Sequence, residues 1–239
     1  MIEYDFVVVG TGVSGLSFAL EASKHGSVAV ITKRASESSN TAWAQGGICC
    51  VADEEDSFES HITDTVDAGA GLCDHEVVKT IVESAPSAIE KMVNIGVQFD
   101  TSSTGKYELG KEGGHSQRRV LHSKDTTGKE ISEKLICSAE KSKNIEIFEH
   151  HFAIDVITTE KLGISGTNEV VGIYVLNEST GEILTFRSDN VVLCTGGCGR
   201  VYLYTTNPNI ATGDSPPKEV GDKSSATFVS VVSTFALSI

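Results

Sequence analysis

Basic residues are scarce in this sequence. The 239 residues include 19 Lys and Arg against 33 Asp and Glu, which gives a formal net charge of −14 at pH 7. A nucleic-acid-binding surface needs clustered positive charge to neutralise phosphates. No stretch of the sequence concentrates basic residues in this way, so we expect neither RNA nor DNA as a partner.

Long apolar runs are also missing. A membrane-spanning helix needs about 20 consecutive apolar residues, and no run approaches this length. The first apolar segment begins at Phe6, which leaves no room for a secretory signal or a transit segment before it. We therefore expect no membrane association and no targeting segment in this chain, and the sequence alone leaves the compartment open.

Paired C-x-x-C spacing, the mark of many zinc sites, does not occur. The chain has six cysteines: Cys49, Cys50, Cys73, Cys137, Cys194 and Cys198. Cys49 and Cys50 are adjacent, which is a poor arrangement for a disulfide between them. We therefore expect reduced thiols in a reducing compartment and no metal site.

A glycine-rich turn follows the first apolar run. Residues 6–9 are Phe-Val-Val-Val, and residues 10–15 form a G-x-G-x-x-G pattern that leads into a helix-like segment. Gly10 permits the tight turn, Gly12 lets the backbone approach a pyrophosphate, and Gly15 lets the helix pack against its strand. The same pattern also occurs in glycine-rich turns that bind nothing. Here the order of strand, turn and helix predicts a dinucleotide site with the phosphates at the helix N-terminus.

The next strand lacks the acidic residue that would grip the ribose of NAD. Residues 28–32 are a short, β-branched apolar run, which predicts a buried parallel strand. Thr32, Lys33 and Arg34 stand where a carboxylate would be needed. An NAD-type ribose contact is therefore not supported. Lys33 either contacts a phosphate or ribose, or lies with Arg34 in a solvated turn.

A small, polar segment at residues 38–48 ends in Gly46 and Gly47. Its composition predicts a loop that leads into a short helical turn. Small residues and a Gly-Gly pair suit a backbone that lies flat against a planar ligand. The alternative is a flexible surface loop.

The rest of the chain shows mixed helix and strand patterns. Apolar spacing predicts helices at residues 76–95, with a kink or a break at Pro86, and at about 125–142. Strand patterns follow at 145–148, 152–157, 170–176 and 183–187, the last two forming a hairpin. Residues 190–197 predict a buried strand that runs into a Thr-Gly-Gly turn. Such a turn is either plain or beside a cofactor.

Two motifs make a family resemblance specific. Residues 39–47 are S-N-T-A-W-A-Q-G-G, and residues 111–119 are K-E-G-G-H-S-Q-R-R. Together with the opening fingerprint they resemble the flavoprotein family of succinate dehydrogenase, fumarate reductase and L-aspartate oxidase, with the L-aspartate oxidase branch most similar. Supporting segments are residues 67–74, 119–122 and 202–208. The resemblance runs from about Asp5 to Asp214.

The resemblance implies an α/β fold: a Rossmann-like FAD-binding domain with a parallel sheet and an antiparallel β-meander. It also implies which residues contact FAD. They are Gly10, Thr11, Gly12, Val13, Ser14, Gly15, Lys33, Asn40, Thr41, Ala42, Trp43, Ala44, Gln45, Gly46, Gly47, Thr195, Gly196 and Asp214.

Asn40 bears on how FAD is held. Covalent members of the family carry a histidine at this position, and its ring is bonded to the flavin. An amide cannot form that bond, so the resemblance implies non-covalent, dissociable FAD, as in L-aspartate oxidases.

The chemistry that the resemblance implies is oxidation of L-aspartate to iminoaspartate, the first step of de novo NAD biosynthesis, with oxygen or fumarate as the electron acceptor. Glu112 matches the family position near the substrate amino group, and His115 is a further substrate-binding candidate. They belong to a polar cluster with Ser116, Arg118, Arg119 and His122, which could supply groups for two carboxylates. The alternative for this cluster is a solvated charged loop.

The composition changes abruptly after Asp214. Pro216 and Pro217 cannot enter the helix that the family has there, and the Ser/Val/Phe-rich residues that follow have no periodicity related to the preceding fold. We therefore predict an FAD-binding domain at residues 1–214 and a divergent, disordered tail at 215–239. The capping domain and the principal catalytic arginine of the family are then absent, and we expect weakened FAD affinity and negligible aspartate turnover.

Two other functions stay open at this point. One is a non-catalytic FAD-binding fragment, and the other is a fumarate reductase or succinate dehydrogenase flavoprotein. The resemblance implies a plastid for a plant protein and the cytoplasm otherwise. The oligomeric state does not follow from the sequence.

Overall fold

The computed structural model describes residues 1–214. The predicted tail, residues 215–239, lies outside the described residues. The described chain forms two compact units. The first contains residues 1–43 and 135–214, and the second contains residues 44–134. One helix, α5 (Thr127–Lys141), contains the second boundary.

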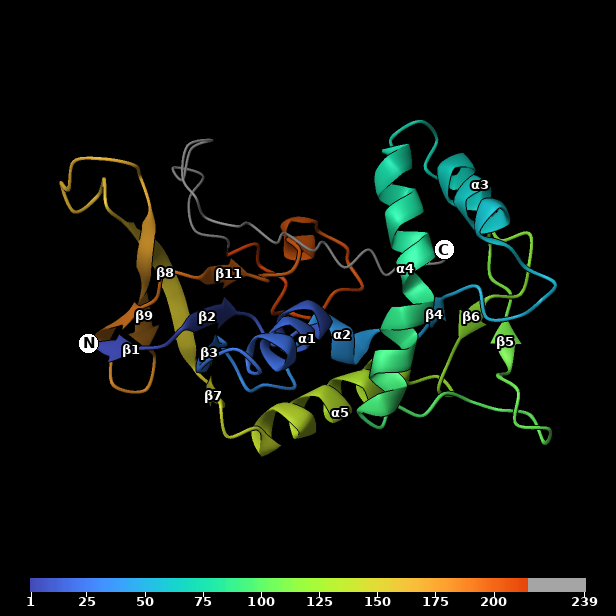
Figure 1. The fold of residues 1–239 in the computed structure, drawn as a ribbon, viewed down its shortest axis with the longest axis horizontal. Coiled ribbons are helices and arrows are strands. Elements are labelled where there is room, and N and C mark those ends of the chain that lie inside the picture. Colours follow the sequence, from blue (N-terminus) through green and yellow to red (C-terminus); the bar gives the residue numbers. More distant parts are fainter. Residues whose placement is uncertain (215–239) are drawn as a thin grey trace. The chain divides into compact units, whose positions relative to one another are not determined.

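A four-stranded parallel sheet organises the first unit (Figure 1). Its order is β11 (Val191–Leu193), β2 (Phe6–Val9), β3 (Val28–Ile31) and β7 (Ile145–Phe148). All three pairings are parallel, and Val8 pairs with both Val30 and Val192. The predicted strands at 6–9 and 28–32 are confirmed. The strand after residue 190 joins the same sheet, next to the strand that enters the glycine-rich turn.

The second sheet of this unit is an antiparallel meander with one extra strand. Strands β8 (His151–Thr158), β9 (Val170–Asn177) and β10 (Ile183–Arg187) pair in sequence order, and β9 and β10 form the predicted hairpin. The short strand β1 (Ile2–Glu3) pairs with β10 in parallel. The predicted fold class, an α/β domain with a parallel sheet and an antiparallel β-meander, is confirmed.

Apolar residues on both faces of the parallel sheet hold the first unit together. On one face, Val7 and Ile31 share a core with Ile173 and Phe186 of the meander, and all four are fully buried. On the other face, Val8 and Val30 pack with Ala19 of helix α1 (Val13–Ala22). Burial on both faces explains why these strands are continuous apolar runs rather than alternating ones.

Helices and a small sheet form the second unit. Helix α3 (Phe58–Ala68) packs on α4 (His75–Asn94) through Ile62, Val78 and Val82. Helix α4 continues through Pro86, so of the predicted kink or break the break is excluded. The sequence analysis missed the three-stranded antiparallel sheet of β4 (Ile48–Cys49), β6 (Val120–Leu121) and β5 (Leu109–Gly110). Each of its strands has two residues, too few for a period to be visible.

Two very short helices complete the described chain. Helix α2 (Asn40–Trp43) is the predicted helical turn of the 38–48 segment, and a 3-10 helix spans Gly199–Val201. No helix in the described residues 1–214 has the length and apolar character needed to cross a bilayer.

The second unit contains a buried ion-pair network. The guanidinium of Arg119 is fully buried and donates two hydrogen bonds to Asp56, at 2.9 and 2.8 Å, and one to Asp64, at 2.6 Å. Burial alone raises the pKa of Asp64, but hydrogen bonds from Ser116 and Arg119 outweigh it, so the pKa lies below its ordinary value. Asp64 therefore stabilises the fold in its charged form.

Replacing Arg119 tests this network. An Arg119→Met variant leaves two carboxylates without their cation, and we expect a loss of about 3–5 kcal/mol in the free energy of unfolding. Arg118→Met is the matched control, because Arg118 is exposed and donates to the Leu109 carbonyl at 3.2 Å. We expect a change of about 0.5 kcal/mol or less for this control. Urea unfolding followed by circular dichroism measures both values.

The same network gives a direction for pH. A carboxylate with a lowered folded-state pKa contributes stability above its unfolded pKa of about 4, and the contribution is lost as pH falls through the folded value. The native chain should therefore lose stability in this acidic window. In the urea experiment, an equal loss of unfolding free energy in Arg119→Met and Arg118→Met would show that Arg119 does not hold the unit together.

Candidate functional site

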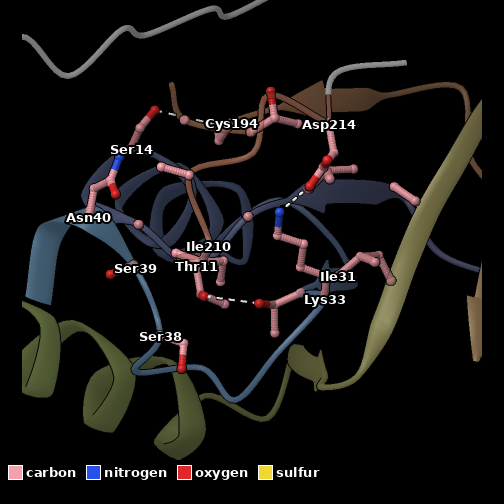
Figure 2. Close-up of a pocket in the computed structure, with 18 of the residues that line it drawn as sticks. Thr11, Ser14, Ile31, Lys33, Ser38, Ser39, Asn40, Cys194, Ile210 and Asp214 are labelled. Atoms are coloured by element: carbon pink, nitrogen blue, oxygen red, sulfur yellow. Dashed lines mark hydrogen bonds and ion pairs between the residues drawn. The ribbon is translucent and has the colours of Figure 1, made fainter. Parts of the chain in front are cut away.

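A pocket lies where the parallel strands of the first unit end (Figure 2). It collects segments that are far apart in the sequence: residues 9–14, 31–33, 38–41, 151–153, 194–197 and 210–214. Ligands of open parallel sheets bind at the carboxyl ends of the strands. The position of this pocket matches that rule.

Each glycine of the opening turn has a different physical reason for being a glycine. Gly10 has a φ of +114°, and a Cβ there would overlap the Cys194 carbonyl oxygen of the neighbouring strand end. A Cβ on Gly15 would overlap the Gly10 carbonyl oxygen. At Gly12 a Cβ would meet only the Thr41 hydroxyl, at 3.4 Å. Packing therefore requires Gly10 and Gly15, whereas Gly12 keeps the pocket open.

The N-terminus of α1 faces this pocket. Gly12 is the N-cap residue and has no side chain to cap the helix. The Val13 N–H donates to the Thr41 hydroxyl at 2.9 Å, which ties α1 to α2. A helix N-terminus lined by small residues is a favourable site for a phosphate group.

An ion pair lies on another wall of the pocket. The Lys33 ammonium donates to the Asp214 carboxylate, as the dashed line in Figure 2 shows. Thr212 also donates to Asp214, at 2.6 Å. Burial raises the pKa of Asp214, but the hydrogen bonds from Lys33 and Thr212 outweigh it and lower the pKa below its usual value. The pocket thus holds a carboxylate acceptor and an ammonium donor. Lys33 is part of the pocket, whereas Arg34 pairs with Glu178.

Asn40 lines the pocket and has a buried side-chain acceptor. Its side chain is one of those that line the cavity (Figure 2). Its Oδ1 is buried and has no hydrogen-bond partner among the described residues. A buried acceptor without a donor costs about 1–3 kcal/mol. A ligand that donates a hydrogen bond here would remove this cost.

Most of the predicted cofactor residues line this pocket. They are Gly10, Thr11, Gly12, Val13, Ser14, Lys33, Asn40, Thr41, Thr195, Gly196 and Asp214. Gly15 instead packs behind the turn, Ala42 and Trp43 end helix α2, and Ala44, Gln45, Gly46 and Gly47 lie in the second unit. Their contact with a cofactor stays a prediction. The sequence analysis missed His151, Phe152 and Ala153, because nothing in a meander strand signals that it reaches the pocket.

The two family motifs meet inside the second unit. A Cβ on Gly46 would lie 3.6 Å from a Glu112 carboxylate oxygen, so the Gly-Gly loop and the Glu112 side chain are neighbours. A Cβ on Gly47 would overlap the Leu121 carbonyl oxygen of β6. The Gly46 carbonyl accepts a hydrogen bond from the Thr127 hydroxyl at 2.7 Å. The loop is therefore fixed within its unit and is not a free surface loop.

His115 lies in a cluster with the half-buried Cys49 and the buried His61. The Cys49 Sγ is 3.3 Å from His115 Nε2, and His115 Nδ1 is 3.4 Å from an Arg119 nitrogen. Burial and then the Arg119 charge lower the pKa of His115 below its ordinary value. The same two causes lower the pKa of His61 to about 4. Burial, then the Glu112 charge, raises the pKa of Cys49 to about 11. All three groups are therefore neutral near pH 7.

The remaining members of the predicted polar cluster have partners of their own. Arg119 is engaged by Asp56 and Asp64, so the expectation that it supplies a cation to a ligand is corrected to a structural role. Ser116 donates to Asp64 at 2.8 Å, and His122 Nδ1 is 2.9 Å from Asp100. The solvated-loop alternative does not describe the buried Arg119 or the half-buried His122, whereas Ser116 is exposed.

Comparison with known proteins identifies close relatives. The L-aspartate oxidase of Yersinia pestis is 46% identical over 214 residues, which cover 88% of this chain and 40% of that protein. The chloroplastic L-aspartate oxidase 2-a of Nicotiana tabacum is 45% identical over 212 residues, 88% of this chain and 32% of that protein. The chain therefore spans well under half the length of these relatives.

Solved structures share the fold. Quinol fumarate reductase of E. coli superposes with a TM-score of 0.83 at 31% identity, covering 89% of this chain and 36% of that one. The family model described as "FAD binding domain" matches residues 5–221. The chain belongs to this FAD-binding family, and FAD is the cofactor that this membership indicates.

Proposed function

We propose that the pocket of the first unit binds FAD. The residues fit this cofactor. The α1 N-terminus suits the pyrophosphate. The Lys33–Asp214 pair offers a donor and an acceptor to ribose or phosphate oxygens. The buried Asn40 Oδ1 has no hydrogen-bond donor among the described residues. For the predicted FAD residues outside the pocket, Gly15 and Ala42 to Gly47, contact with the cofactor stays a prediction.

Gly12 offers the sharpest test of this pocket. A Cβ there would meet only the Thr41 hydroxyl, at 3.4 Å, so we expect the fold to accept a substitution, and a larger side chain fills the space that a pyrophosphate needs. We expect Gly12→Val to lower FAD affinity on the order of 100-fold. Quenching of flavin fluorescence on titration measures the dissociation constant.

Ser17→Val is the matched control for this test, because Ser17 is exposed on α1 and does not line the pocket. It should bind FAD as the native chain does. Thermal melts of both variants check that folding is intact. Equal FAD affinity in Gly12→Val and the native chain would place the cofactor elsewhere.

FAD is held without a covalent bond in this proposal. Asn40 occupies the position at which covalent members of the family carry the linking histidine, and an amide forms no such bond. We therefore expect acid precipitation of the loaded protein to release all flavin into the supernatant, measured by absorbance. Flavin that stays with the washed pellet would contradict this expectation.

We further propose that the chain supplies the FAD-binding part of an L-aspartate oxidase. The observation that carries this proposal is the position of Glu112 beside Gly46, which joins the two motifs shared with that branch. A carboxylate there pairs with the substrate ammonium and separates aspartate from succinate, which has none. His115, which follows Glu112 after two glycines in the same motif, is the second candidate for substrate contact.

The reaction proposed is oxidation of L-aspartate to iminoaspartate, in the first step of de novo NAD biosynthesis. Bound FAD would supply the acceptor for the hydride of the substrate Cα, with oxygen or fumarate as the final electron acceptor. Glu112 orients the amino group. The neutral His115 supplies a hydrogen-bonding group rather than a cation for the substrate carboxylates, so the cations these need come from other residues. For a plant member we propose the plastid, as in the tobacco relative.

A charge-neutral variant tests Glu112. Loss of one charged pair costs about 1.5–3 kcal/mol, so Glu112→Gln should weaken L-aspartate binding about 10- to 100-fold. Succinate binding should change much less, because it lacks the ammonium. Glu108→Gln is the control, since Glu108 is exposed in the same unit. The readout is the perturbation of the bound flavin spectrum by each ligand under anaerobic conditions, which requires no turnover.

The outcomes separate the candidate functions. A preference for aspartate that Glu112→Gln abolishes supports the proposal. The fold shared with quinol fumarate reductase favours a succinate or fumarate flavoprotein as the second candidate, and a preference for succinate in the native chain would support it. A flavin spectrum that neither ligand perturbs would indicate an FAD-binding chain without this catalytic role.

A further inference from the structure

Three potential metal ligands from separate parts of the chain meet in the second unit. Cys49 is on β4, His61 is on α3, and His115 is in the loop before β6. One ligand atom from each side chain lies within 4.8 Å of the other two. The pair Cys49 Sγ and His115 Nε2, at 3.3 Å, is already close to the roughly 3.5 Å expected between sulfur and nitrogen ligands of one tetrahedral zinc ion.

His61 contributes an independent observation. Its side chain is only 6% exposed, and its Nδ1 is buried with no hydrogen-bond partner among the described residues. The ring centroids of His61 and His115 are 5.9 Å apart and tilted, so the two imidazoles do not stack. A buried ring nitrogen without a partner is unusual in a native fold. It is the kind of group that a bound ion would satisfy.

The charges around the cluster favour a cation. Three carboxylates act electrostatically on its members: Asp56, Asp64 and Glu112. Arg119 is the positive group that acts on all three ligands. The surroundings therefore hold three negative groups against one positive group, and Arg119 has the largest single charge effect on both histidines. A divalent ion would neutralise part of this excess.

We propose that Cys49, His61 and His115 form a binding site for a divalent ion of the zinc class. One thiolate and two imidazoles are a ligand set that zinc and cobalt accept, and three protein ligands leave one coordination position for water. Binding breaks the Cys49 S–H bond and forms a metal–sulfur bond, and the thiol proton passes to the buffer. Dense C-x-x-C spacing is not needed, because the fold brings the three residues together.

One contact sets the strength of this site. When the metal takes His115 Nε2, the ring proton moves to Nδ1, which faces the Arg119 nitrogen at 3.4 Å. Two donors then face each other, so the ring shifts slightly away from Arg119. The site is accordingly weaker than a structural zinc site without a neighbouring cation.

Occupancy would have a consequence for the proposed function. If His115 contacts the substrate, an ion on its Nε2 removes that group and the ion acts as an inhibitor. This consequence rests on the proposed function, whereas the site itself does not. Ion binding to the chain without FAD tests the site separately.

The experiment titrates Co²⁺ into the full, reduced chain after removal of metals with a chelator. We expect one equivalent to bind and to produce the near-ultraviolet charge-transfer band of a cobalt thiolate. Cys49→Ser should abolish the band, and His61→Asn and His115→Asn should each weaken binding by about 10-fold or more. Zn²⁺ should displace the Co²⁺ and bleach the band.

Two controls keep the result decisive. Cys137→Ser removes an exposed thiol outside the cluster and should leave the band unchanged. Thermal melts show whether the buried His61 variant is folded; Cys49→Ser and His115→Asn carry the test if it is not. A band that persists in Cys49→Ser, or the absence of any bound Co²⁺ at micromolar protein and metal, would overturn the proposal.

Discussion

The close approach of two backbone segments at Gly10 is the constraint on which the first unit depends. The strand that enters the turn and strand β11, which ends just before Cys194, are parallel neighbours, and no Cβ fits between them at Gly10. The helix then starts so near the turn that a Cβ on Gly15 would overlap the Gly10 carbonyl oxygen in the same way. These contacts place the N-terminus of α1 and the Thr195–Gly196 turn around one cavity. The pocket is thus a product of packing before any ligand is considered.

The sequence predicts those parts of the fold that a local pattern can carry. The strands at residues 6–9 and 28–31 are buried on both faces, so their continuous apolar sequences predict parallel strands. The hairpin of β9 and β10 has a clear turn between alternating strands. Other features depend on partners that are distant in the sequence. They are the two-residue strands, the pairing of β1 with β10, and the position of β8 beside the pocket. No local pattern reports such partners.

The candidate site divides in the same way. Motif similarity located Lys33, Asn40 and Asp214, and the structure brings them to one cavity. Charge alone was a poor guide for Arg119, because burial and two carboxylates decide its role and neither is visible in the residue type. The cluster of Cys49, His61 and His115 was missed because its members are far apart in the sequence. Gly47 illustrates a further ambiguity, since contact with Leu121 explains it as well as a ligand does.

The wide spread of the pocket walls along the chain has a consequence for biogenesis. Because the cavity needs both the first turn and the segment around Asp214, a nascent chain on the ribosome cannot capture a nucleotide until nearly all of this region has emerged. Contacts of such long sequence separation also form slowly. Until then the β-branched strands near the N-terminus lack their neighbours in the sheet, and such a state is prone to aggregation. Chaperone assistance during synthesis would matter more for this architecture than for one whose ligand site is built from adjacent segments.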